Sequence, residues 1–103
     1  MVTAVIFRTD RQGSVFALMP EIPADNNGHY CTAYEHLGQH STADYALCIA
    51  RSRPANPDDY SDLLFELEKR GYRVDVYRRA TPSMHERRRM AAFSRPSSRL
   101  GRY

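Results

Sequence analysis

One segment of the chain carries a complete set of helix signals, and it limits the fold more than any other feature. It reads N-P-D-D-Y-S-D-L-L-F-E-L-E-K-R-G, residues 56–71. Asn56 is a favourable N-cap, Pro57 suits the first helical position, and Gly71 suits the left-handed residue that ends a helix. Its apolar side chains recur at helical spacing at Tyr60, Leu63, Leu64 and Leu67. Because such a stripe must be buried, the rest of the chain has to supply a matching surface.

Four stretches rich in β-branched and aromatic residues are predicted to be strands and to supply that surface. They cover residues 2–8, 14–19, 29–37 and 72–79. The first three follow one another closely, with a polar turn between the first two, which favours an antiparallel meander. The last strand is expected to join the same sheet.

A shorter helix is predicted between the third strand and residue 54. Ser41 would cap it, since S-T-A-D places an acid three residues after a serine. Its apolar stripe would consist of Ala43, Ala46, Leu47 and Ala50. Pro54 would end it. The predicted fold is therefore a single α+β domain with the order β-β-β-α-α-β, an antiparallel sheet and two helices packed on one face.

Length and composition restrict the type of protein. The 103 residues suffice for one domain, and no run of about 18 apolar residues is present that would span a membrane. The N-terminal sequence M-V-T-A-V-I-F-R-T-D lacks the basic start of a signal peptide. Two cysteines do not form a disulfide framework. We therefore expect a cytoplasmic protein with reduced thiols and no membrane association.

The net charge of +3 is unevenly distributed along the chain. Residues 1–79 hold nine basic and eleven acidic side chains, whereas residues 80–103 hold six arginines and one acid. The sequence thus predicts a mildly acidic domain over 1–79 followed by an Arg-rich tail. In the tail, S-M-H-E resembles a capping box and predicts a short helix over 83–93, with a flexible segment beyond it.

Three of the four histidines and one of the two cysteines lie within residues 29–40, H-Y-C-T-A-Y-E-H-L-G-Q-H. Thiolates and imidazoles are zinc ligands, so one hypothesis is a small metal-binding or thiol protein. Its candidate ligands are Cys31, His36, His40 and Cys48. Their spacing matches no zinc-finger pattern, and phosphate-loop and dinucleotide motifs are absent, so no cofactor is predicted. The favoured interpretation is a strand followed by a polar turn.

Aromatic and charged residues indicate two alternative binding surfaces. Tyrosines on strand faces, together with helix acids, favour a protein interface. The residues of this surface are Tyr30, Tyr34, Tyr77, Asp58, Asp59 and Asp62. The alternative is an RNA or DNA site in the tail, where arginines would contact phosphates. Its residues are Arg87, Arg88, Arg89, Arg95 and Arg99.

Three stretches of the chain carry a resemblance to a known family. They are F-A-L-M-P-E-I-P-A-D (16–25), Y-E-H-L-G-Q-H-S-T-A-D-Y (34–45) and R-P-A-N-P-D-D-Y-S-D-L-L-F-E-L-E-K-R-G-Y (53–72). Together they resemble a small, uncharacterised proteobacterial family that is often encoded on plasmids and other mobile elements, over about residues 1–79. The family has no assigned activity, so the resemblance implies no site residues. It implies a regulator or inhibitor of host defence or nucleic-acid machinery, and the leading hypothesis is a non-enzymatic protein-interaction module, monomeric or dimeric.

Overall fold

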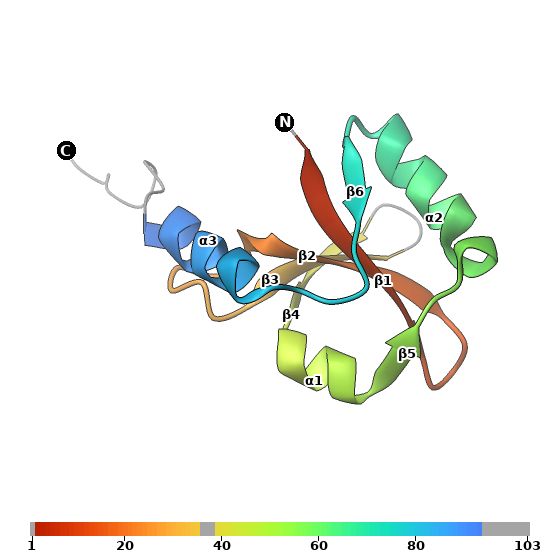
Figure 1. Cartoon of the computed structure of the whole chain (residues 1–103), viewed down its shortest axis with the longest axis horizontal. Coiled ribbons are helices and arrows are strands. Elements are labelled where there is room, and N and C mark those ends of the chain that lie inside the picture. Colours follow the sequence, from red (N-terminus) through yellow and green to blue (C-terminus); the bar gives the residue numbers. More distant parts are fainter. Residues whose placement is uncertain (1, 36–38, 94–103) are drawn as a thin grey trace.

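The fold is a six-stranded sheet with helices on both of its faces (Figure 1). The computed structural model describes residues 2–35 and 39–93. The strands are β1 Thr3–Asp10, β2 Val15–Pro23, β3 Cys31–Glu35, β4 Gln39–Ala43, β5 Ser52–Pro54 and β6 Val74–Val76. The helices are α1 Tyr45–Ala50, α2 Pro57–Lys69 and α3 Pro82–Phe93. The expected α+β class and the single domain are confirmed.

Strand β1 has two short partners along one of its edges. The strand order is β4-β3-β2-β1-β5, and every neighbouring pair in this order is antiparallel. β6 pairs with the beginning of β1 in parallel, with Thr3 opposite Val74, whereas β5 pairs with its end, with Arg8 opposite Pro54. The predicted meander of the first three strands is confirmed, but the last strand is short and parallel to β1.

Alternation along β1 and β2 directs apolar side chains to both faces of the sheet. On one face, Val5, Phe7 and Met19 pack with Leu63 and Leu67 of α2. The N-cap of α2 is the predicted Asn56, whose backbone N–H donates to the Asp59 carboxylate at 3.3 Å. Its end is also as predicted, with Gly71 at a φ of 102°. This helix forms as expected because its signals are local.

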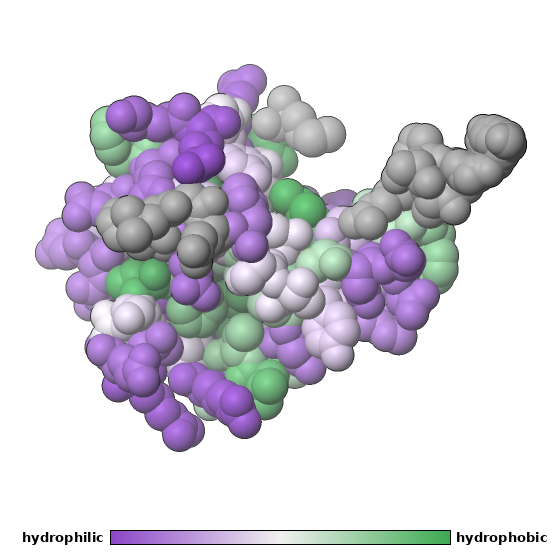
Figure 2. Space-filling model, turned by 180° about the vertical axis from the view of Figure 1, so that it is seen from behind, coloured by the Kyte–Doolittle hydropathy of each residue, from purple (hydrophilic) through white to green (hydrophobic). Residues whose placement is uncertain are grey.

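The opposite face carries a second core, in which Ile6 and Leu18 pack with Tyr45 and Ile49 of α1. The prediction that both helices share one face is therefore wrong. The reason is β5, which joins the sheet edge between the two helices and so carries the chain from one face to the other. α1 is short, with six residues. Seen from behind, the molecule shows apolar residues near its middle (Figure 2).

The segment around residue 41 also differs from the prediction. Gln39–Ala43 is a strand that pairs with β3, where a turn and a helix start were expected. Asp44 caps α1 in place of Ser41, because its carboxylate accepts from the Leu47 amide at 3.1 Å. The S-T-A-D sequence resembles a helix cap, but its first three residues belong to the strand that pairs with β3. Pro54, expected to end a helix, lies instead on the edge strand β5, a position that tolerates proline.

Helix α3 packs against the end of β2 and belongs to the folded body of the protein. The expected helix over 83–93 is present and begins one residue earlier, at Pro82. Its Arg88 is buried: Nε donates to the Gly28 carbonyl at 2.8 Å and Nη1 donates to the Pro20 carbonyl at 2.9 Å. Gly28 has a φ of 73° and lies directly under the α3 backbone. Residues 94–103 of the predicted tail lie outside the described residues.

Candidate functional site

Tyr34 lies in the core rather than on the predicted aromatic surface. Its side chain is fully buried on the α2 face of the sheet, and its hydroxyl donates to Glu66 at 2.5 Å. The guanidinium of Arg70 lies 5.6 Å from the centre of its ring. Burial and the hydrogen bond to Glu66 raise the pKa of Tyr34. These contacts hold α2 against the sheet, so the role of Tyr34 is to position that helix.

The other two predicted tyrosines lie on separate parts of the molecule. Tyr30 is 42% exposed and precedes β3, whereas Tyr77 is 37% exposed and follows β6 on the far side of β2 and β1. The Tyr77 hydroxyl donates to the Asp75 carboxylate at 3.2 Å, and this bond raises the pKa of Tyr77. The structure therefore does not bring the three tyrosines together into one patch.

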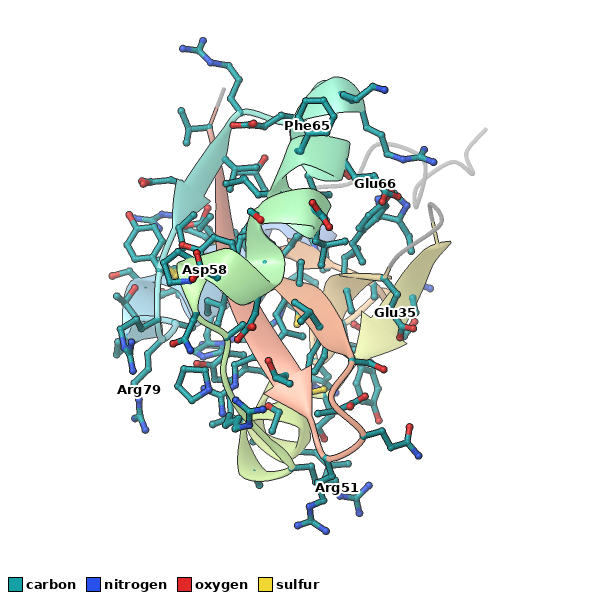
Figure 3. All side chains as sticks on the ribbon, turned by 90° about the vertical axis from the view of Figure 1, so that its right-hand side faces the viewer. Glu35, Arg51, Asp58, Phe65, Glu66 and Arg79 are labelled. Carbon is teal, nitrogen blue, oxygen red and sulfur yellow. The ribbon has the colours of Figure 1, made fainter. Side chains whose placement is uncertain are left out.

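The outer stripe of α2 is the more prominent surface. It consists of Asp58, Asp62, Phe65 and Lys69, spaced at helical intervals opposite the core stripe. Phe65 is 63% exposed, and Lys69 Nζ lies 5.5 Å from the centre of its ring. Figure 3 looks onto α2 and shows Asp58 and Phe65 along it. The third predicted acid, Asp59, is committed to the helix cap instead.

A shallow hollow of about 560 Å³ adjoins this stripe. Its lining residues are Asp62, Phe65, Glu66, Lys69 and Arg70. Phe65 was not among the residues predicted for the protein-binding surface, which were acids and tyrosines. The signal was present, however: Phe65 is an apolar residue outside the helix's core stripe.

The structure separates the described members of the predicted metal set. Cys31 and Cys48 belong to the α1 face, whereas His40 lies on the α2 face, where Nε2 is 2.9 Å from the Tyr72 hydroxyl. His36 lies outside the described residues. Among residues 2–35 and 39–93, no group of three or more metal-ligating side chains could hold an ion.

Both thiols are in surroundings that disfavour thiolate chemistry. Burial raises the pKa of Cys31 to about 11, and burial together with nearby Asp44 raises that of Cys48. We expect Cys31, in a Cys48→Ala variant, to react with Ellman's reagent at pH 8 about a hundredfold more slowly in the folded protein than in urea, because so few molecules carry the thiolate. Equal rates in the two states would restore the thiol hypothesis.

The described tail arginines have different roles. Arg88 is internal to the fold, Arg87 forms an ion pair with Glu21, and Arg89 is exposed. Arg95 and Arg99 lie outside the described residues. A different group of arginines, which sequence reasoning missed, lines an open hollow of about 470 Å³ between the β1–β2 turn and the connection from α1 to β5. These are Arg11, Arg51 and Arg53.

Comparison with known proteins found no matching family model, no matching curated protein and no matching solved structure. Among the described residues, no helix is both long enough and apolar enough to cross a membrane.

Proposed function

We propose that this protein is a non-enzymatic module that binds a protein partner through the outer stripe of α2. The observation that carries the proposal is the exposure of Phe65, whose ring projects from a helix that already buries a full apolar stripe on its other side. The phenyl group is flanked by Asp62 and Lys69. Residues that dominate the binding energy of protein interfaces are commonly aromatic side chains surrounded by a polar or charged rim.

The charges on the stripe indicate the chemistry of the partner. Asp58 and Asp62 are exposed toward the N-terminal end of the stripe, and Asp62 lines the same hollow as Phe65. A complementary protein surface would offer an apolar pocket for the phenyl group and basic side chains next to that pocket. Binding of this kind occupies the partner's surface, which is how a small regulator or inhibitor acts. The resemblance to a family carried on mobile elements supports such a role.

The attachment of α2 to the sheet suits a binding helix. Tyr34 donates to Glu66 from below, and Arg70 lies over the Tyr34 ring, so the helix is fixed before any partner arrives. A pre-organised surface loses little conformational entropy on binding. The raised pKa values of both thiols support the non-enzymatic part of the proposal, because a protonated thiol is a poor nucleophile.

We expect Phe65→Ala to weaken partner binding by about 2 kcal/mol, or roughly thirtyfold, as for other aromatic interface anchors. The test begins with affinity purification from host cells, with and without nuclease, using the wild-type protein and the variant in parallel. A partner that survives nuclease and is lost with the variant is then purified, and its dissociation constant is measured by calorimetry.

Leu47→Ala is the matched control, since Leu47 is 46% exposed but lies on α1, on the other face of the sheet. It should leave binding unchanged. Both substitutions remove exposed side chains, so each should change the free energy of unfolding by no more than about 0.5 kcal/mol. Equal retention of every nuclease-resistant partner by the wild type and by Phe65→Ala would sink the proposal.

A further inference from the structure

Five exposed arginines from three separate segments gather at one end of the sheet. They are Arg11, Arg51, Arg53, Arg78 and Arg79, called here the edge arginines. The first is in the β1–β2 turn, the next two flank the start of β5, and the last two follow β6. Figure 3 shows Arg51 and Arg79 in the part of the molecule away from Phe65 and Glu66.

A sixth arginine, Arg8, lies beneath this group and connects its parts. It is 5% exposed, and its Nη2 donates to the carbonyls of Ile49 at 3.1 Å and Ser52 at 2.7 Å. Its Nε donates to the Ser52 hydroxyl at 2.9 Å, so all three acceptors are neutral. Burial lowers the pKa of Arg8, and the positive charges of Arg79 and Arg78 lower it further. Pro54 of β5 and Arg78 line one hollow, so the residues after β6 lie close to the β5 edge.

The edge arginines form no ion pair in the part of the chain that the structure describes. Asp10 lines the same hollow, but its Oδ1 accepts from the amides of Gln12 and Ser14, both at 2.9 Å. The described residues hold twelve basic and twelve acidic side chains, so their net charge is zero. The clustering of arginines at this edge therefore does not result from an overall excess of positive charge. Like charges held together repel, and a bound polyanion would relieve this repulsion.

An apolar hollow of about 130 Å³ adjoins the edge arginines. Tyr60, Val76, Tyr77 and Arg78 contribute to its lining, and the Tyr77 side chain is 37% exposed. A free phosphate has no ring that could stack on an aromatic side chain. The bases of a duplex are already stacked on one another and so cannot stack on the protein. Unpaired bases, in contrast, stack on aromatic side chains next to backbone-binding arginines.

From this juxtaposition we infer that the protein binds single-stranded nucleic acid at the β5–β6 edge of the sheet. The edge arginines contact the phosphates, and Tyr77 supplies a stacking surface for a base. The inference does not depend on the proposed protein partner, because the two surfaces share no residue.

The test is a fluorescence-anisotropy titration of the full chain with a labelled, mixed-sequence single strand of about 15 nucleotides. With five phosphate contacts, the logarithm of the binding constant should fall with the logarithm of salt concentration at a slope of about −3.5. Arg78→Gln combined with Arg79→Gln should reduce this slope to about −2 and weaken binding about tenfold. Tyr77→Ala should also weaken binding about tenfold, with the slope unchanged, because stacking releases no counterions.

The matched control combines Arg73→Gln with Arg89→Gln, which removes two exposed positive charges from elsewhere on the surface. It should retain the wild-type affinity and slope, as should a chain ending at Phe93 and the Phe65→Ala variant. The inference is overturned by an absence of binding, by a control loss equal to that of the edge variant, or by loss of binding in the shortened chain. Equal or tighter binding of the matching duplex would overturn the assignment to single strands.

Discussion

Replacing Arg88 with alanine is expected to lower the free energy of unfolding by about 4 kcal/mol, since a hydrogen bond from a charged donor contributes about 1.5–3 kcal/mol. Arg88 is 5% exposed and donates to the carbonyls of Gly28 and Pro20, both of which belong to buried residues. Alanine would leave both acceptors without this donor and would also open a cavity under α3. For a domain of this size, the loss corresponds to a fall in Tm of roughly 15 °C or more.

Urea denaturation followed by circular dichroism measures this loss. Arg89→Ala is the matched control, because it removes the same side chain from the next, exposed position of α3 and should change stability by no more than about 0.5 kcal/mol. Similar midpoints for the two variants would show that α3 contributes little to the fold. Arg88 would then return to the candidates for phosphate contact.

Gly28→Ala is expected to destabilise the protein by about 4 kcal/mol, through two independent effects. The residue has a φ of 73°, a left-handed conformation in which a side chain is strained. In addition, a Cβ atom would lie 2.7 Å from the Cα atom of Arg89. That neighbour is helix backbone, so relief requires α3 to move off the sheet. Hydrogen exchange should therefore show loss of protection in α3 together with the fall in the free energy of unfolding.

Gly13→Ala separates the two effects. Gly13 has a φ of 86°, but a Cβ atom there would meet nothing within 4 Å. This variant should lose only the conformational part, about 1–2 kcal/mol, and should keep α3 protected. Equal losses for both glycines would show that the close approach of α3 to residue 28 is not a real constraint.

The sequence predicted those elements whose signals are local. α2 was foreseen with its cap, its buried stripe and its terminal Gly71, because each of these features depends on neighbours within a few residues. β4 and β5 were missed, because their strand conformation depends on pairing with β3 and β1 and not on their own residues. The placement of α1 and α2 on opposite faces follows from β5, so one missed edge strand produced the error in the layers.

The candidate surfaces were also predicted less well where their residues depend on contacts with residues far away in the sequence. Tyr34 was predicted to lie on an exposed face of its strand. Its hydroxyl instead donates to Glu66, which is 32 positions away in the sequence. Arg88 lies within a basic run, and its partners are 60 and 68 positions away. Arg11 and Arg51 line one hollow although 40 positions separate them, because the sheet brings their segments together. Of these residues, only Phe65 could have been identified from the sequence, because it is an apolar residue on the face of α2 opposite the core stripe.

The pairing of β5 and β6 with the same edge of β1 also determines when the sheet can be completed during synthesis. Thr3 pairs with Val74, so the beginning of β1 is synthesised about seventy positions before its partner. Until then, the beginning of β1 presents an open strand edge, and the buried carbonyls of Pro20 and Gly28 lack Arg88. Such distant pairings slow folding and expose incomplete chains to association with one another. The nascent chain is therefore especially vulnerable to association before α3 has been synthesised.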